Sequence, residues 1–185
     1  MAEIEVRVAV DPEDQQYVPR WRELQEEAGK AGAAIAVRPE GLLEDRVANG
    51  EAVLAFLDGE FVGAGYLKTW ENGRFLSQSG VVVDPKARRM GIASAIKARV
   101  MEVSLGKHPD ATCVSLTLSP AIEKMNRALG FRNVSYADLP QGDDFWEGCK
   151  TCPYYETLVA NQRVTCNCAA LRLDPGAGGG ETPAP

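Results

Sequence analysis

The chain has 185 residues, of which 45% are hydrophobic and 25% charged, an ordinary balance for a globular protein large enough to bury a core. Its formal net charge of -6 argues against a nucleic-acid-binding surface, which carries a basic excess. The N-terminus lacks the basic and apolar regions of a signal peptide, and no apolar run approaches the ~20 residues of a membrane helix, so we expect a cytoplasmic protein with neither a membrane nor a nucleic-acid partner.

The N-terminal part of the chain predicts a strand followed by two helices. Apolar and polar residues alternate over residues 3–10, which is typical of a strand with one buried face. A helical apolar pattern follows over residues 19–31. A shorter helix after Pro39 is expected to stop at Asn49-Gly50, because these residues favour the conformation that ends helices.

The clearest local pattern lies in residues 52–83. Apolar runs are separated there by Asp58-Gly59 and by Asn72-Gly73. Both dipeptides accept the positive φ angles of tight hairpin turns. We therefore predict a three-stranded antiparallel meander.

The second half of the chain alternates helices and strands before it becomes irregular. Ser119-Pro120 is typical of a helix start, because the hydroxyl caps the first turn and proline suits its first position. The order of elements predicts an α/β (α+β) fold, a single domain over residues 1–173 with a mostly antiparallel mixed sheet flanked by helices. The expected elements are a helix over 91–104, a strand over 112–118, a helix from 120 to Gly130, a strand over 131–136, an irregular Cys-rich insertion over 137–168, a strand over 169–173 and a flexible Gly/Pro tail over 174–185.

The junction between the meander and the next helix combines two arginines with a glycine. Arg88 and Arg89 precede Gly91, which opens the helical pattern. A helix N-terminus presents unpaired N–H groups and the positive end of a dipole, and glycine lets an anion approach the backbone closely. Residues 88–93 therefore predict a pyrophosphate site. A basic turn that enters an amphipathic helix is the alternative interpretation of these six residues taken alone.

The wider context of this junction resembles the GNAT superfamily of acyl-CoA-dependent N-acyltransferases. The family signature is Arg/Gln-x-x-Gly-x-Gly/Ala after a strand that often ends in Val-x-Pro, with a later Asn-Pro-Ala … Leu-Gly-Phe motif. The resemblance covers roughly residues 3–136 and the last strand. The matching residues are Arg88, Gly91 and Ala93 in the signature, Val83-Asp84-Pro85 before it, and Ser119-Pro120-Ala121 with Leu129-Gly130-Phe131 after it.

The resemblance implies a GNAT fold and transfer of an acetyl (acyl) group from acetyl-CoA to a primary amine, by direct attack in a ternary complex. The backbone of residues 88–94 would bind the pyrophosphate, and the last residues of the preceding strand would pair with the pantetheine arm. The acceptor would lie near residues 19–45 and 66–80. The implied coenzyme-binding residues are Val81, Val83, Arg88, Arg89, Met90, Gly91, Ile92, Ala93, Ser94 and Ser119.

Two positions depart from the family pattern. Ser79 stands where many members carry a glutamate base, and Asn126 stands where many carry a tyrosine acid. An amide donates hydrogen bonds but supplies no proton at pH 7. We therefore expect catalysis largely by orientation, with water accepting the amine proton. The alternative is a non-catalytic GNAT-like module that senses coenzyme A or binds a partner; a zinc-dependent nucleic-acid binder is disfavoured by the charge.

Four cysteines stand in two closely spaced pairs, Cys149-x-x-Cys152 and Cys166-x-Cys168. Four thiolates suit one tetrahedral zinc ion with a structural role, because such a site leaves no open coordination position. Two disulfides, four unlinked thiols and an iron–sulfur cluster are the alternatives. The fifth cysteine, Cys113, lies in an apolar strand and is expected in the core.

The stretch LPQGDDFWEGCKTCP also resembles, more weakly, the C-terminal part of short-form amino-acid N-acetyltransferases of arginine biosynthesis. That likeness nominates an α-amino acid, such as glutamate, as the acceptor. A small amine, a protein N-terminus and a lysine side chain are the alternatives. The sequence leaves the oligomeric state open, a dimer included.

Overall fold

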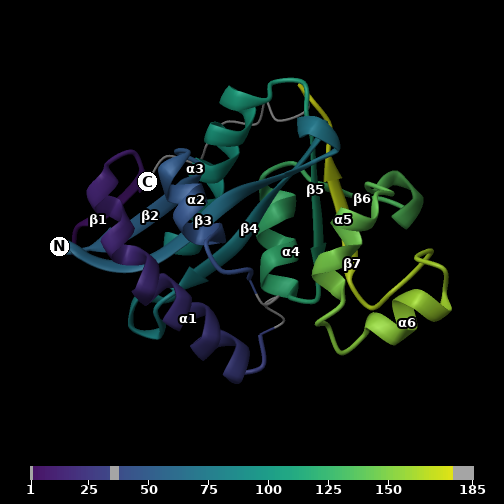
Figure 1. Ribbon diagram of the computed structural model, residues 1–185, viewed down its shortest axis with the longest axis horizontal. Helices are drawn as coiled ribbons and strands as arrows, with labels where there is room; N and C mark the ends of the chain where they lie inside the picture. The colour runs from purple at the N-terminus through teal and green to yellow at the C-terminus, as the bar shows by residue number, and fades with distance from the viewer. Residues whose placement is uncertain (1, 34–37, 177–185) are drawn as a thin grey trace. The chain divides into compact units, whose positions relative to one another are not determined.

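The computed structural model describes residues 2–33 and 38–176, and Figure 1 shows their strands and helices. By their internal contacts the residues form two compact units, residues 1–68 with 78–107 and residues 69–77 with 108–185. The strands form a seven-stranded sheet in the order β1-β2-β3-β4-β5-β7-β6. Their bounds are β1 (Ile4–Val8), β2 (Ala52–Leu57), β3 (Glu60–Trp70), β4 (Phe75–Val83), β5 (Thr112–Thr117), β6 (Arg132–Asn133) and β7 (Ala169–Leu173).

The sheet is mixed and mostly antiparallel, as the sequence predicts. β1 pairs with β2, β2 with β3, β5 with β7 and β6 with β7 in antiparallel fashion, whereas β4 and β5 are parallel. Both predicted hairpin turns are confirmed by their backbone angles. Asp58 and Gly59 have φ angles of 51° and 80°, and Asn72 and Gly73 have φ angles of 56° and 84°. The two turns set β2, β3 and β4 next to one another in the sheet.

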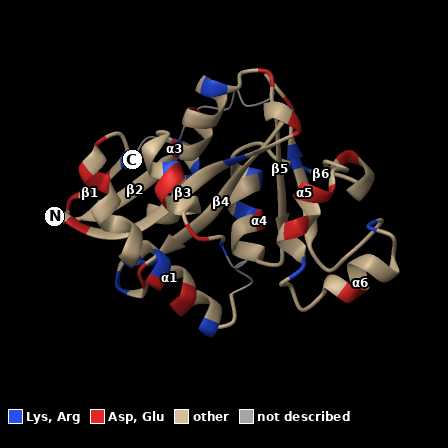
Figure 2. Ribbon diagram, in the orientation of Figure 1, with Lys and Arg blue, Asp and Glu red and all other residues tan. Residues whose placement is uncertain are grey.

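The helices of the first unit pack on the strands, because the apolar face of each helix lies against the apolar side chains on one face of the strands. In α1 (Val18–Lys30) and α2 (Leu42–Ala48), the residues Trp21, Leu24 and Leu43 are buried in one cluster with Leu54 of β2 and Tyr66 of β3. The helix α3 (Ile92–Lys107) contacts β1 and β2. Its Ile96 side chain approaches the β3 backbone so closely that a Cβ at Gly65 would stand 2.9 Å from it. Figure 2 shows acidic and basic residues along α1.

The second unit has an aromatic core. Trp70 and Phe145 lie edge to face with ring centroids 5.0 Å apart, and Phe145 and Trp146 do so at 4.9 Å. Tyr136 stacks on Trp146, and Leu158 is buried in the same cluster. Short helices pack on this core, because each helix buries one or two large side chains in it.

The expectation of an irregular segment over 137–168 is therefore wrong in part. The segment contains α5 (Asp143–Trp146) and α6 (Tyr155–Ala160) beside single 3-10 turns. The strand expected over 131–136 is shorter than predicted, because the Ser135 hydroxyl accepts the Ala137 N–H at 3.2 Å and starts a 3-10 turn.

The helix α4 (Pro120–Ala128) begins as predicted, with the Ser119 hydroxyl accepting the Ile122 N–H at 3.4 Å, and Gly130 follows it with a φ of 93°. The tail predicted over 174–185 lies outside the described residues from 177 onward. Asp174, its first residue, is held by ion pairs to Arg132 and Arg172. Within the described ranges no helix combines the length and the apolar character needed to cross a membrane.

Candidate active site

The start of α3 leaves backbone N–H groups without helical partners. Gly91 precedes the helix with a φ of 80°, and its carbonyl accepts a hydrogen bond from the Ala95 N–H at 3.0 Å. The N–H groups of residues 92–94 lie in the first turn, where the helix offers no carbonyl to them. A Cβ added at Gly91 would meet no described atom within 4 Å, so the space beside it is open. Such a terminus favours an anion through its N–H groups and its dipole.

Basic side chains belong to the same turn, which we call the 88–94 loop. Arg88, Arg89 and Met90 are exposed, and Arg89 adopts a left-handed φ of 65°. The Arg88 Nε donates a hydrogen bond to the Val83 carbonyl at 3.2 Å, which ties this side chain to the end of β4. Ile92 is the exception, because its side chain is buried in the core. The structure thus brings the predicted pyrophosphate residues together on one largely exposed turn.

Val81 and Val83, predicted to pair with the pantetheine arm, lie at the end of β4. β4 and β5 pair at Leu76 and Cys113, and the two valines lie beyond that pair. The Val83 carbonyl already accepts one hydrogen bond from Arg88, and a carbonyl has a second lone pair. The contact of these valines, and of the cap residue Ser119, with a coenzyme stays a prediction.

Asp84 connects the 88–94 loop to α1. Its Oδ1 accepts the Lys86 N–H at 3.0 Å, and its Oδ2 accepts the Arg20 Nη2 at 3.0 Å. Burial pushes the pKa of the Asp84 carboxyl upward, but the hydrogen bonds from Lys86 and Arg20 outweigh it and hold this pKa below its ordinary value. The carboxylate is therefore charged at neutral pH and fixes the turn that leads into the loop.

The two positions matched to the family's base and acid belong to different compact units. Ser79 is half-buried in β4, and Asn126 is fully buried in α4. The apolar residues Ile122, Met125 and Leu129 of this segment are only half-buried, whereas the polar Asn126 is the buried residue of α4. Two further contacts fix its place: its Nδ2 donates to the Ser115 hydroxyl at 2.9 Å, and its main-chain carbonyl accepts the Phe131 N–H at 3.1 Å. Catalytic roles for both residues remain predictions.

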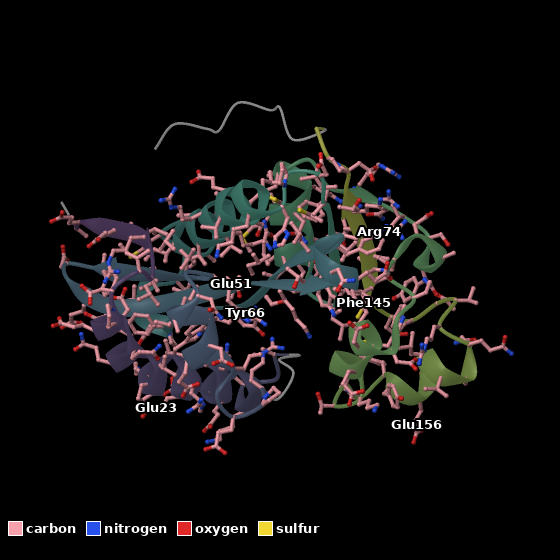
Figure 3. All side chains as sticks on the ribbon, turned by 45° about the horizontal axis from the view of Figure 1, so that its top comes forward. Glu23, Glu51, Tyr66, Arg74, Phe145 and Glu156 are labelled. Carbon is pink, nitrogen blue, oxygen red and sulfur yellow. The ribbon has the colours of Figure 1, made fainter. Side chains whose placement is uncertain are left out.

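A buried polar cluster that the sequence did not reveal surrounds Tyr66. The Tyr66 side chain is fully buried, and its hydroxyl has no hydrogen-bond partner among the described residues. The guanidinium carbons of Arg38 and Arg46 lie 5.5 and 5.9 Å from the centroid of its ring. The Nε atoms of both arginines are buried and lack partners in the same described part of the chain. Figure 3 labels Tyr66, whose ring lies near the Arg46 guanidinium, and Glu51, which forms an ion pair with Arg46.

The backbone of β4 packs against the Tyr66 ring at Gly80. Gly80 has a φ of 63°, and a Cβ there would stand 2.4 Å from the Tyr66 ring and 2.9 Å from the Gln25 amide nitrogen. Its carbonyl accepts the Gln25 Nε2 at 3.2 Å and the Trp21 Nε1 at 3.5 Å. Only glycine fits this close approach and this angle. We call Gln25, Arg38, Arg46, Tyr66 and Gly80 the Tyr66 cluster.

The Tyr66 hydroxyl is a neutral hydrogen-bond donor. Burial raises the pKa of Tyr66, and the nearby charges of Arg38 and Arg46 lower it only in part. The phenol therefore keeps its proton at neutral pH. One signal could have revealed the cluster: Gln25 lies four residues after Trp21, on the buried face of a helix whose other inward residues are apolar.

The four cysteines of the C-terminal segment line one small cavity of about 20 Å³, together with aromatic and leucine side chains such as Trp146. Burial, and then the neighbouring cysteines, raise the pKa of the Cys168 thiol to about 12. Among the described residues there is no disulfide, and no three His, Cys, Asp or Glu side chains are arranged to hold a metal ion. The structure thus brings the predicted ligands together without forming a ready metal site. Cys113 is buried in β5, as predicted.

Comparisons with known proteins point to one fold. A family model described as the acetyltransferase (GNAT) family matches residues 15–131. No curated protein matches the sequence. Among solved structures, N-acetylglutamate synthase from Neisseria gonorrhoeae, complexed with coenzyme A and N-acetyl-glutamate, superimposes with a TM-score of 0.65 at 19% identity over 95% of this chain. The chain spans only 36% of that enzyme.

Two other structures match nearly their full length. Rv2747 from Mycobacterium tuberculosis, in complex with CoA and NLQ, has a TM-score of 0.62 at 20% identity, covering 92% of this chain and 98% of that one. The putative acetyltransferase yncA from Salmonella typhimurium, with acetyl-CoA, has a TM-score of 0.61 at 14% identity, covering 99% and 98%. At such identities these likenesses show the fold.

Proposed function

The chain belongs to the GNAT acetyltransferase family, and from that premise we propose that it transfers an acetyl group from acetyl-CoA to the primary amine of a small acceptor. One observation carries the proposal: the open terminus of α3, where Gly91 turns with a positive φ and the first-turn N–H groups have no helical partners. A pyrophosphate bound there would be held by backbone N–H groups, the helix dipole and two arginines.

In the proposed reaction the amine attacks acetyl-CoA directly in a ternary complex. The amine nitrogen forms a bond to the thioester carbonyl carbon, the carbon–sulfur bond breaks, and the coenzyme leaves as a thiolate. The nitrogen loses a proton to water, and the thiolate is protonated from solvent. A backbone N–H near Val81 would stabilise the oxyanion.

A calorimetric titration with acetyl-CoA tests the coenzyme site. We expect saturable binding that Gly91→Glu abolishes, because the substitution strains a left-handed backbone and places a negative charge beside the pyrophosphate. Gly106→Glu is the matched control: it adds the same side chain near the other end of α3, where a Cβ meets no described atom within 4 Å. Equal loss in both variants, or no binding by the unmodified protein, would refute the coenzyme site.

Product analysis then tests the transfer itself. The protein is incubated with acetyl-CoA and a panel of primary amines, and acetylated products are sought by mass. Coenzyme binding without any acetylated product would favour the competing function, a non-catalytic coenzyme A sensor or partner-binding module. Ser79→Ala and Asn126→Ala that both leave turnover unchanged would remove their catalytic assignment.

We also propose that the four clustered thiols bind one structural zinc ion. They come from two separate segments, yet line one cavity with room for about one water-sized occupant. The aromatic rings and thiols that line the cavity offer few hydrogen bonds to a water molecule. The thiols, in contrast, are suitable ligands for a thiophilic ion. The sulfurs would have to close around the ion, since the described residues hold no ready-made group.

Metal analysis decides the zinc proposal. Protein purified with reductant should carry about one zinc per chain, as one Cys₄ site holds one ion, and Cys149→Ser with Cys168→Ser should lose it. Cys113→Ala, which alters a cysteine outside the cavity, should keep the metal. A content well below one equivalent in the unmodified protein would contradict the proposal.

A further inference from the structure

We propose that the Tyr66 cluster binds a carboxylate of the acceptor, so that the substrate class is an amine that carries a carboxylate, such as an α-amino acid. This inference rests on the proposed transfer to a primary amine. It adds a feature of the acceptor that neither the 88–94 loop nor the fold specifies.

The first argument is that three buried donors around one ring lack acceptors among the described residues. The Tyr66 hydroxyl and the Nε atoms of Arg38 and Arg46 are all buried, and none has a hydrogen-bond partner within residues 2–33 and 38–176. Buried polar groups are almost always paired, so an unpaired group calls for an explanation. Here three stand together, since both guanidinium groups lie within 6 Å of the same ring. A carboxylate, with two oxygens that accept about four hydrogen bonds, would satisfy them together.

The second argument is the charge balance. The Arg46 guanidinium forms an ion pair with Glu51, so its charge is already matched. Arg38 forms no ion pair among the described residues, and its guanidinium carbon lies 5.5 Å from the centroid of the Tyr66 ring. The group therefore carries one unmatched positive charge beside a neutral phenol. A single carboxylate would neutralise it, and a planar guanidinium is shaped for bidentate contact with that group.

The third argument is position. The cluster is closed by Gly80, whose backbone approaches the Tyr66 ring so closely that no side chain fits. Gly80 lies in β4 between Ser79 and Val81, the strand that leads into the 88–94 loop. A carboxylate held by Arg38 and Tyr66 would therefore keep the rest of a small acceptor beside the strand predicted to align the thioester.

Acceptor preference is the first test. The protein is assayed with acetyl-CoA and each of the twenty L-amino acids, and with the matching amino acid amides, which keep the amine but lack the carboxylate. We expect at least one amino acid to be acetylated with a KM about tenfold to hundredfold below that of its amide, the range typical of a charge-assisted hydrogen bond. Equal KM values for every acid and amide would overturn the inference and leave the transfer function standing.

Two variants separate binding from a structural role. Arg38→Gln should raise the KM for the preferred amino acid about tenfold or more and leave the KM for its amide unchanged. Arg22→Gln is the matched control, because Arg22 pairs with Glu44 on the same unit and lies outside the cluster. Tyr66→Phe should raise the same KM while the melting temperature stays equal or rises, since it removes a buried hydroxyl that has no partner. A lower melting temperature with an unchanged KM would overturn the inference.

A binding measurement keeps the inference separate from the proposed function. Should no amine be acetylated, the transfer function fails, and calorimetric titration of the coenzyme A complex with the same twenty amino acids still decides the site. Saturable binding that is lost in Arg38→Gln and kept in Arg22→Gln would support a carboxylate site. Absence of binding by every amino acid would overturn it.

Discussion

The 88–94 loop and the Tyr66 cluster are both suited to anions, but they are built in different ways. The loop offers backbone N–H groups from consecutive residues around Gly91, on a largely exposed turn. The cluster offers side chains from α1, α2 and β3 together with Arg38, packed against the β4 backbone at Gly80, and its central tyrosine is fully buried. One site is local and made of backbone, and the other is non-local and made of side chains.

This difference bears on what each site can recognise. Backbone N–H groups at a helix terminus bind any phosphate of suitable shape, which fits a coenzyme shared by a whole family. Buried side chains bind one group in one orientation, because an analogue that lacks it leaves them unpaired. We therefore expect the loop to tolerate conservative changes of side chain and the cluster to be sensitive to them.

The largest expected effect is a loss of stability at the closing point of the cluster. Gly80→Ala places a Cβ 2.4 Å from the Tyr66 ring on a backbone with a φ of 63°. Strain of the left-handed backbone and overpacking together should lower the free energy of unfolding by about 2–5 kcal/mol. The shift is measured by urea denaturation.

Gly59→Ala is the control for backbone strain alone. Gly59 has a φ of 80°, but a Cβ there meets no described atom within 4 Å. It should cost only about 1–2 kcal/mol, so the difference between the two variants reports the contact with Tyr66. Equal losses would show that the contact between Gly80 and Tyr66 carries no strain, and the cluster would be looser than the structure indicates.

The same contrast explains how much of the fold was predictable. Asp58-Gly59 and Asn72-Gly73 were recognisable as turns because their angles are set by neighbouring residues in the chain. The short helices α5 and α6 were missed because their burial depends on an aromatic core assembled from distant segments. Asn126 was recognised only through a family motif, and its full burial in α4 is opposite to what its polarity suggests.

The two parts of the candidate site differ in the same way, since the 88–94 loop is formed by neighbouring residues and the Tyr66 cluster by distant segments. The residues of the 88–94 loop could be singled out because arginine, glycine and a helical pattern are adjacent in the sequence, and their role in coenzyme binding stays a prediction. The Tyr66 cluster was not, because Gln25, Arg38 and Tyr66 are each unremarkable in their own segments. Only the fold shows that Gln25 lies beside Gly80, and that the Arg38 Nε and the Tyr66 hydroxyl are buried near each other without partners among the described residues. The family resemblance placed the acceptor near residues 19–45 and 66–80, ranges that include these three residues, and this placement stays a prediction.

A smaller effect should separate coenzyme binding from the acceptor site. Ser94 is exposed in the first turn of α3, so Ser94→Glu adds a negative charge where the pyrophosphate would bind. We expect the Kd for acetyl-CoA to rise about tenfold from charge repulsion, while the acceptor KM is unchanged at saturating coenzyme. The unliganded helix should gain about 0.3–1 kcal/mol, because a carboxylate near an N-terminus is favourable.

Ser94→Gln has nearly the same shape without the charge, and it should change the affinity for acetyl-CoA much less than Ser94→Glu. If the two variants bind equally weakly, the effect is steric. If both bind as well as the unmodified protein, the pyrophosphate does not lie at this terminus, and the basic turn is only the entrance to a helix.

The smallest expected effect concerns Asp84, which connects α1 to the turn before the 88–94 loop. It holds Arg20 of α1 and the Lys86 N–H before the 88–94 loop, and these contacts keep the pKa of its carboxyl below the ordinary value despite the opposing effect of burial. Because the folded pKa is depressed, the stabilisation is fully present above the unfolded pKa of about 3.9 and is lost as the pH falls through the folded pKa. Since Arg20 is 39% exposed, Asp84→Asn should cost only about 1 kcal/mol at pH 7.

The pH dependence distinguishes this link from a general loss of charge. The difference in unfolding free energy between the unmodified protein and Asp84→Asn should shrink as the pH is lowered below about 3.9, because asparagine does not titrate. Glu26→Gln, at an exposed position of α1, is the control and should show little difference at any pH. A difference for Asp84→Asn that stays constant down to the acid transition would mean that the carboxylate charge is not what joins α1 to the loop, and that shape alone holds the turn.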